Sequence, residues 1–425
     1  MRKYLVLSGI VLAAIAAQPR NASAKPPRLG DPVELMKMAR DDLPCITFAQ
    51  PFIRVSPNGD KCIYIRRTGG DYTAMLHIRT FGPPVAEHAV PAAVAASPTY
   101  WTWGFSGRSW RADGLRVGYL MVGSKDGMAD QEIRHRLGVG YFDWTVPLPQ
   151  QSGGGLDLGA KRSHTSVTYA CRGTALWRAE SDLRDYASCR VVGPNGVLYK
   201  GRGFAIHDLS PSPDNRHIAW TEVPAPRRRR RGAVPGAAKE AAARAGVKGK
   251  ADPPPVGTST VIVDTKTRKV VRRIPLSMNV CGPVVWAAGG DVLCYGDVVK
   301  IGKLYRREVK AMTVATGDSK LIVRDAKAVG VLGGRLVCNR GPACTQTVMM
   351  GSSYMPPPGT DPRPQTDSIV LCDLDKDAEP IPLRTGAYAQ QVVGDALIYA
   401  EINGSHVIVW KVKLADDQPT RNGER

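Results

Sequence analysis

A hairpin turn recurs at regular intervals along this chain of 425 residues. Its clearest copies are Ser56-Pro57-Asn58-Gly59, Arg111-Ala112-Asp113-Gly114 and Ser212-Pro213-Asp214-Asn215, each followed by a run of alternating apolar and polar residues. Asn-Gly and Asp-Gly suit tight hairpins because the central positions of such turns require a positive φ. Fainter copies centre on Gly173, Gly290, Gly334 and Gly394. The pattern predicts many short antiparallel strands.

The spacing of the turns predicts an architecture. One interval contains an insertion of about 30 residues, and without it the period is roughly 45 to 60 residues, the length of a four-stranded unit. Residues 260–274, 309–323 and 368–383 each read as a third strand, a polar turn and a fourth strand. Seven turns therefore predict an all-β fold, a seven-bladed β-propeller, with six or eight blades as alternatives.

The same turns resemble those of a known family. The Ser-Pro-Asn-Gly, Arg-Ala-Asp-Gly and Ser-Pro-Asp-Asn sequences are similar to the repeats of TolB-like β-propellers, which are WD40-like, and of the propeller in prolyl-oligopeptidase-type enzymes. The resemblance covers most of residues 46–415 and implies architecture rather than activity. We expect neither the α/β domain that precedes the TolB propeller nor a peptidase domain, because too few residues lie outside 46–415.

The first residues read as an export signal. Arg2 and Lys3 precede an apolar run from Leu5 to Ala17, and Ala22-Ser23-Ala24 suits signal peptidase. The apolar run is shorter than the roughly 20 residues that a membrane-spanning helix needs. We therefore expect removal of the signal peptide, residues 1–24, and a periplasmic or secreted protein without a transmembrane segment. An uncleaved membrane anchor is the alternative.

A short strap precedes the predicted propeller. Asp31-Pro32-Val33-Glu34 has the signature of a helix start, so residues 25–45 are predicted to form an N-terminal strap with one short helix. The last predicted unit contains three strands, and residues 45–48 are expected to supply a fourth and close the ring. Residues 416–425 are predicted to be a polar tail.

The chain is strongly basic, with a formal net charge of +20. Residues 224–258 interrupt the fourth unit as a basic insertion that we expect to be disordered, because it has no apolar face to pack. Its five consecutive arginines are Arg227, Arg228, Arg229, Arg230 and Arg231. They are candidates for binding a polyanion, an anionic polysaccharide or envelope component, and a tolerated surface loop is the alternative. In an exported protein no specific nucleic-acid partner is expected.

Two histidines are candidates for a ligand site. His164 and His207 precede their hairpin turns by nine and eight residues, which predicts that both lie on innermost strands of neighbouring blades, at the mouth of the central channel. Gln50 has an equivalent position. Together they would suit a divalent metal, an arrangement similar to that of oligogalacturonate lyases, and that resemblance implies action on acidic sugars. The other interpretation is ordinary hydrogen-bonding histidines and no cofactor.

Two tryptophans are further candidates for ligand binding. Trp101 and Trp103 alternate along a predicted strand, so both indoles would face one side of it. If exposed, they would stack on sugars or on protein side chains, and if buried they would pack within a blade together with Trp110.

The motifs of common enzyme classes are missing. The chain has no Gly-x-Ser-x-Gly, no P-loop and no Cys-x-x-Cys, and residues 373–384 lack the glycine and glutamate of a calcium loop. Several of the nine cysteines stand in alternating strands and read as small buried residues. The sequence therefore predicts an exported, non-catalytic, monomeric binding or scaffold protein that recognises a protein or an anionic polysaccharide. A metal-dependent carbohydrate-active enzyme is the alternative.

Overall fold

The described part of the chain is almost entirely β-strand. The computed structural model describes residues 28–42, 52–67, 74–89, 102–104, 110, 116–124, 135–143, 150–151, 165–172, 175–182, 188–224, 257–277, 284–301, 304–342, 366–375 and 378–415. One 3₁₀ turn, η1 (Arg40–Asp42), interrupts the strands near the N-terminus. Within these ranges no helix is long and apolar enough to cross a membrane.

The strands of the described residues form seven four-stranded antiparallel sheets. Sheet 1 is β2 (Ile53–Val55), β3 (Lys61–Arg67), β4 (Ala74–Thr80) and β5 (Glu87–Ala89). Sheet 2 is β6 (Thr102–Gly104), β7 (Arg116–Ser124), β8 (His135–Asp143) and β9 (Gln150–Gln151). Sheet 3 is β10 (Thr165–Arg172), β11 (Ala175–Asp182), β12 (Cys189–Gly193) and β13 (Gly196–Gly201). Sheet 4 is β14 (Phe204–Pro211), β15 (His217–Pro224), β16 (Ser259–Asp264) and β17 (Val270–Pro275).

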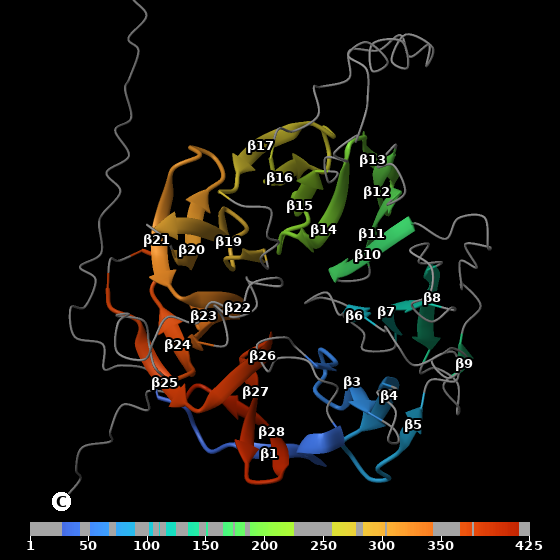
Figure 1. The fold of residues 1–425 in the computed structure, drawn as a ribbon, viewed down its shortest axis with the longest axis vertical. Coiled ribbons are helices and arrows are strands. Elements are labelled where there is room, and N and C mark those ends of the chain that lie inside the picture. The colour runs from blue at the N-terminus through green and yellow to red at the C-terminus, as the bar shows by residue number, and fades with distance from the viewer. Residues whose placement is uncertain are drawn as a thin grey trace, which may run out of the picture.

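The remaining sheets complete the arrangement. Sheet 5 is β18 (Val285–Trp286), β19 (Val292–Ile301), β20 (Leu304–Thr313) and β21 (Ser319–Arg324). Sheet 6 is β22 (Ala326–Leu332), β23 (Arg335–Arg340), β24 (Ser368–Cys372) and β25 (Ile381–Thr385). Sheet 7 is β26 (Ala387–Val393), β27 (Ala396–Asn403) and β28 (His406–Lys413), with β1 (Val33–Ala39) beside β28. Figure 1 shows the sheets around a common centre, with β6, β10, β14, β22 and β26 nearest to it.

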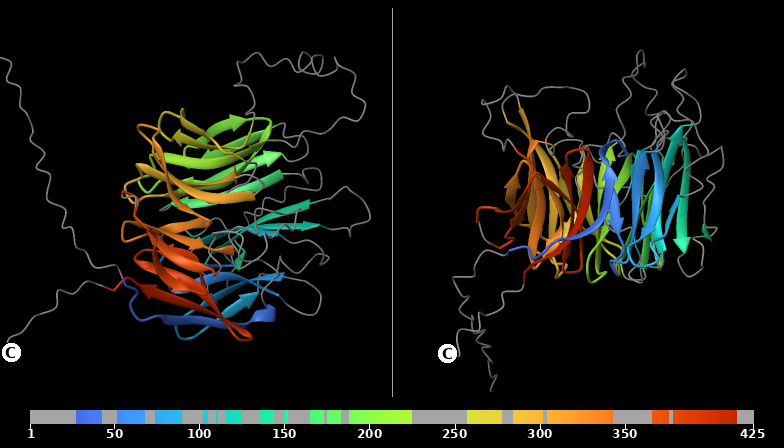
Figure 2. Two further views of the ribbon diagram at one scale, coloured as in Figure 1. Left: turned by 60° about the vertical axis from the view of Figure 1, so that its left-hand side comes forward. Right: turned by 90° about the horizontal axis from the view of Figure 1, so that it is seen from below.

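Apolar clusters join the sheets in sequence. Separate clusters link sheets 3 and 4, 4 and 5, 5 and 6, 6 and 7, and finally 7 and 1. The contact between the last and the first sheet closes the series into a ring, and the side views in Figure 2 show the strands running roughly along its axis. The arrangement is consistent with a β-propeller and confirms the predicted all-β class.

The N-terminal strap contains a strand, so the predicted short helix is wrong. β1 pairs with β28 in antiparallel register, from Val33 opposite Lys411 to Ala39 opposite His406. Without β1, the backbone of β28 would be an unpaired edge next to sheet 1, and pairing that edge outweighs the local signal of a helix start. The closing strand thus comes from residues 33–39, whereas residues 45–48, the predicted source, lie outside the described residues.

Side chains of β1 alternate as a strand requires. Met36 and Met38 are buried between sheets 7 and 1, whereas Val33, Glu34 and Lys37 are exposed. The two methionines make β1 part of the core that joins the ends of the ring.

Hairpin turns occur at the predicted positions. Gly59 and Asn215 have φ angles of 71° and 57°, in the left-handed region that Gly and Asn adopt most readily. The turns at Gly290, Gly334 and Gly394 are also present. Those predicted at Gly114 and Gly173 lie outside the described residues.

The serine of the Ser-Pro repeat organises two of these turns. The hydroxyl of Ser56 donates to Asp60 at 2.7 Å, and that of Ser212 donates to Asp214 at 2.6 Å. Each serine oxygen also accepts the backbone N–H of the residue five positions later, at 3.2 and 2.9 Å. The repeated sequence therefore has one structural role in sheets 1 and 4.

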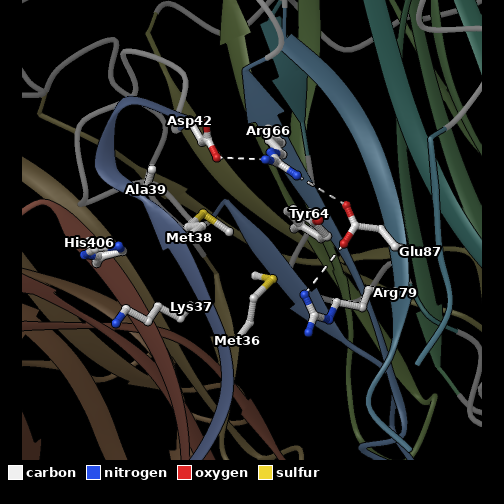
Figure 3. A pocket seen from close by; sticks show the side chains of 10 residues that line it. All are labelled: Met36, Lys37, Met38, Ala39, Asp42, Tyr64, Arg66, Arg79, Glu87 and His406. Atoms are coloured by element: carbon white, nitrogen blue, oxygen red, sulfur yellow. Dashed lines mark ion pairs between the residues drawn. The ribbon is translucent and has the colours of Figure 1, made fainter. Parts of the chain in front are cut away.

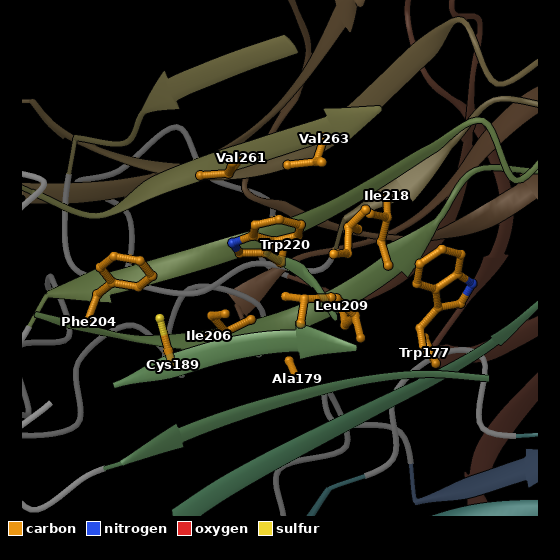
Figure 4. Close-up of a cluster of buried hydrophobic side chains, with 13 residues drawn as sticks. Trp177, Ala179, Cys189, Phe204, Ile206, Leu209, Ile218, Trp220, Val261 and Val263 are labelled. Atoms are coloured by element: carbon orange, nitrogen blue, oxygen red, sulfur yellow. The ribbon is translucent and has the colours of Figure 1, made fainter. Parts of the chain in front are cut away.

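Large aromatic side chains fill the spaces between sheets. Trp220 of β15 has no exposed surface and packs with Phe204, Trp177 and Val261 between sheets 3 and 4 (Figure 4). Trp110 is buried as well, as its packing interpretation predicted.

Two buried indoles tie neighbouring sheets through hydrogen bonds. The Nε1 of Trp110 donates to the backbone carbonyl of Arg54 at 3.1 Å, and the Nε1 of Trp286 donates to that of Ser210 at 2.9 Å. In each case the acceptor belongs to the first strand of the preceding sheet, so the two tryptophans repeat one contact.

The described cysteines behave as small core residues. All five are buried, as the alternating pattern predicted: Cys62, Cys189, Cys294, Cys338 and Cys372. Burial raises the pKa of the Cys189 and Cys294 thiols to about 12, which keeps them protonated and unreactive at neutral pH.

Candidate functional site

One face of the ring carries the longest connections. Because each of sheets 1 to 6 has an even number of antiparallel strands, the chain returns to the same face before it enters the next sheet. Connections between sheets, and those between the second and third strand of a sheet, begin and end at this face, which we call the upper face. They include residues 90–101, 152–164, 225–258 and 341–367. Long connections on a rigid scaffold are the usual place for binding residues.

Two of the sequence-predicted site residues lie on described strands. His207 lies on β14 opposite Thr221, and the backbone of Trp103 lies on β6 opposite Met121. The other candidates lie outside the described residues: Gln50, Trp101, His164, Arg227, Arg228, Arg229, Arg230 and Arg231. In sequence, Gln50, Trp101 and His164 stand just before β2, β6 and β10, and the five arginines stand between β15 and β16. The described strand ends next to these positions belong to the upper face. A shared site of His164 and His207 stays a prediction.

A carboxyl group that the sequence analysis did not single out lies beside His207. Asp208 occupies a β-bulge of β14, between His207 and Ser210, and has a φ of 54°. Desolvation raises the pKa of this carboxyl to about 6, although the positive charges of Lys327 and Arg307 oppose the shift. Non-glycine residues at positive φ and shifted pKa values both concentrate at functional sites.

Three neighbouring sheets contribute to this group, which we call the Asp208 cluster (Asp208, Arg307 and Lys327). Arg307 of β20 is buried, and its backbone carbonyl accepts the N–H of Asp325 at 2.8 Å. Lys327 of β22 pairs in register with Asn339, whose side-chain amide binds the backbone of sheet 7. Both cations therefore come from the two sheets that follow the sheet of Asp208 in the chain.

The charge of the Asp208 cluster depends on pH. Its three side chains carry a formal charge of +2 below a pH of about 6, where Asp208 is protonated, and of +1 above it. The sequence analysis did not single out Asp208, which belongs to no motif, and the members of the cluster stand more than 100 positions apart at the extremes.

His207 has a neutral ring at neutral pH because burial lowers its pKa. A neutral imidazole is the form that binds metals. Among the described residues, no group of three or more His, Cys, Asp or Glu side chains is arranged to hold a metal ion. A metal site at His164, His207 and Gln50 therefore remains a prediction.

Asp208→Asn is expected to stabilise the protein at neutral pH. The raised pKa means that the folded protein holds a proton on Asp208 more tightly than the unfolded chain, so the carboxylate costs stability above a pH of about 6. Raising the pKa from 3.8 to about 6 corresponds to a free energy of roughly 3 kcal/mol. Because the side chain is partly exposed, we expect Asp208→Asn to raise the free energy of unfolding by about 1–2 kcal/mol at neutral pH. Urea unfolding from pH 3.5 to 8 should show a gain that grows between pH 4 and 6 and is absent below pH 4.

Asp214→Asn is the control with the opposite sign. Burial opposes the shift, but hydrogen bonds from the Ser212 hydroxyl and the Arg216 backbone lower the pKa of Asp214. Its carboxylate therefore contributes stability above the unfolded pKa, which is lost as the pH falls, so Asp214→Asn destabilises at neutral pH. A pH-independent gain in Asp208→Asn would contradict a desolvated carboxylate at this position.

We compared the chain with known protein families, curated sequences and solved structures. No protein-family model and no curated protein sequence matches the chain. Among solved structures it is similar to TolB from Acinetobacter baumannii, with 13% identity over 63% of this chain and 53% of that chain and a TM-score of 0.34. A chain of the Mitotic Checkpoint Complex has 10% identity, covers 96% of this chain and 99% of its own length, and gives a TM-score of 0.45.

A prolyl endopeptidase structure has 11% identity over 87% of this chain and 51% of its own, with a TM-score of 0.43. The chain thus spans about half the length of the TolB and prolyl endopeptidase chains that it matches. The likenesses include the two kinds of protein whose repeats the sequence resembles. At these identities and TM-scores the fold assignment rests on the sheet order and on the clusters that join the sheets.

Proposed function

We propose that the chain is an exported, non-catalytic, seven-bladed β-propeller that binds an anionic polysaccharide of the cell envelope with its upper face. The observation that carries the proposal is the upper face itself, where the connections between sheets begin and end and where the connection from β15 to β16 carries the five arginines Arg227 to Arg231. Clustered cations attract an anion, and the net charge of +20 attracts it over a longer range.

Rigidity supports binding rather than turnover. Clusters of apolar side chains join the sheets from sheet 3 round to sheet 1, so the strands form one continuous scaffold. A partner that lies across the upper face would contact several strand ends at once. The five arginines from Arg227 to Arg231 belong to a connection of that face and would add charge to the same surface.

Arginines of the upper face are expected to determine affinity for polygalacturonate. In the variant Arg227→Gln/Arg228→Gln/Arg229→Gln we expect a dissociation constant roughly tenfold higher, about 1.4 kcal/mol for three lost charges at a solvated surface. The matched control is Arg216→Gln/Lys266→Gln/Lys269→Gln, which removes three exposed charges from turns of the opposite face. This control should change the dissociation constant less than twofold. Isothermal titration at two salt concentrations measures both.

The outcomes separate the alternatives. If both triple variants weakened the binding of polygalacturonate equally, the interaction would depend only on the net charge of the protein. That result would refute a binding site on the upper face. Binding of an acidic protein, with none of polygalacturonate, would replace the polysaccharide by a protein partner. Stoichiometric divalent metal in the purified protein, lost in His164→Ala and His207→Ala, would favour the metal-dependent carbohydrate-active enzyme instead.

A further inference from the structure

The dipeptide Asn-Gly stands at three turns that the structure describes: Asn58-Gly59, Asn195-Gly196 and Asn403-Gly404. Asparagine is a chemically labile residue. It is most labile before glycine, because glycine has no side chain to obstruct the approach of its own backbone nitrogen to the asparagine amide. All three asparagines are exposed. The surroundings of each glycine nitrogen therefore decide which turn reacts.

The turn at Asn403 leaves the reacting groups free. Asn403 ends β27 and lies opposite His406 of β28, so Gly404 and Ser405 form the turn between them. Within the described ranges, neither the N–H of Gly404 nor the side chain of Asn403 makes a hydrogen bond. Gly404 has a φ of 58°, and the space beside its Cα is open. Its nitrogen can therefore approach the side-chain amide of Asn403 without first losing a hydrogen bond.

The other two turns hold the corresponding groups in place. The N–H of Gly59 donates to the backbone carbonyl of Ser56 at 2.9 Å, so this nitrogen is engaged. The backbone carbonyl of Asn195 accepts the Nη2 of Arg268 from the turn of sheet 4 at 3.4 Å. That carbonyl belongs to the same peptide group as the next glycine nitrogen, so the contact restrains it. The dipeptide is thus protected in sheets 1 and 3 and open in sheet 7.

We propose that Asn403 is a site of spontaneous deamidation in the folded protein. The Gly404 nitrogen gives up its proton to solvent and attacks the Cγ of Asn403, so that a new N–Cγ bond forms and the side-chain nitrogen takes up a proton and leaves as ammonia. Water then adds to one of the two carbonyls of the cyclic imide and opens it to aspartate or isoaspartate. Water is the only co-reactant. This inference is separate from the proposed function and does not depend on it.

The product would weaken the closure of the ring. The carbonyl of Ser405 accepts the N–H of Arg40 at 2.8 Å, and this bond attaches η1 of the N-terminal strap to the turn. His406, the next residue, lines a pocket of about 330 Å³ between sheets 7 and 1, which we call the seam pocket (Figure 3). Isoaspartate lengthens the backbone at position 403 by one carbon and so displaces Ser405 from Arg40. The strap then loses a contact beside the seam pocket.

The turns serve as controls for one another in the same molecule. The folded protein is kept in mildly alkaline buffer, and mass spectrometry of its peptides follows the conversion of each asparagine. We expect Asn403 to be converted about fivefold faster than Asn58, the factor that one hydrogen bond on the Gly59 nitrogen contributes. In urea, which unfolds the turns, the rates should approach one another. Conversion of Asn403 no faster than that of Asn58 in the folded protein overturns the proposal.

Asn403→Gln tests the effect on the ring. Glutamine keeps the amide one carbon further from the backbone, which disfavours the cyclic imide, and because Asn403 is exposed the variant should fold. We expect the amide of Arg40 to exchange about fivefold faster in aged than in fresh wild type, and at the fresh rate in aged Asn403→Gln. Asn58→Gln, the matched control, should age as the wild type does. Unchanged exchange at Arg40 in protein whose Asn403 is converted would overturn the link to ring closure.

Discussion

Met36→Ala/Met38→Ala is expected to lower the free energy of unfolding by at least about 4 kcal/mol. Both side chains are buried, with 3% and 7% of their surface exposed, and both belong to the cluster that joins sheet 7 to sheet 1. Replacing one buried methionine by alanine costs about 2–5 kcal/mol, and adjacent losses in one cluster enlarge a single cavity. That is a large part of the 5–15 kcal/mol that holds a typical domain folded.

The closure of the ring has a second component, which this variant leaves intact. Gln391 of β26 accepts the N–H of Val55 at 2.9 Å and donates to its carbonyl at 3.2 Å, which ties the first strands of sheets 7 and 1. Next to it, Gln390 accepts the N–H of Phe52 at 3.0 Å. We therefore expect the variant to expose the outer part of the seam first, around β28.

Urea unfolding and hydrogen exchange measure this prediction. The midpoint should fall strongly, and backbone amides of β28 that face β1 should exchange faster than those of β23 in sheet 6. The control is Val33→Ala/Glu34→Ala, which changes two exposed residues of the same strand and should cost less than about 1 kcal/mol. Similar losses in both variants would mean that β1 contributes backbone pairing alone and that its methionines do not close the core.

The hairpins of the fold were predictable because they depend on local chemistry. The turns at Gly59 and Asn215 require positive φ, and the Ser-Pro repeat fixes each of its turns with hydrogen bonds inside five residues. Such information is present in the sequence itself. The same locality explains why the alternating strands and the buried cysteines were identified correctly.

The N-terminal strand was not predictable in this way. Residues 31–34 look like a helix start, and β1 forms because the edge of β28 lies beside it, more than 360 positions later in the chain. The Asp208 cluster and the seam pocket are similar cases, since each combines residues from sheets that meet only after the ring closes. His207 was a candidate from its offset to a hairpin turn, but Asp208 depends on a bulge that no residue pattern announces.

Trp220→Ala is expected to destabilise the protein by about 3–5 kcal/mol. Trp220 has no exposed surface and packs between sheets 3 and 4, against Phe204 and Val261 of its own sheet and near Trp177 of sheet 3 (Figure 4). Its loss leaves a cavity that rigid strands on both sides cannot fill, because each is held in a four-stranded sheet.

Trp220→Phe separates packing from hydrogen bonding. The indole Nε1 donates to Glu222 at 3.2 Å, and Glu222 has no exposed surface and is also bound to Arg273. Phenylalanine keeps most of the apolar volume and removes that one donor, so we expect a loss of about 1–2 kcal/mol. Glu222 then retains Arg273 as its charged partner, which limits the penalty for the buried carboxylate. If Trp220→Ala were no less stable than Trp220→Phe in urea unfolding, the buried indole would not be what holds sheets 3 and 4 together.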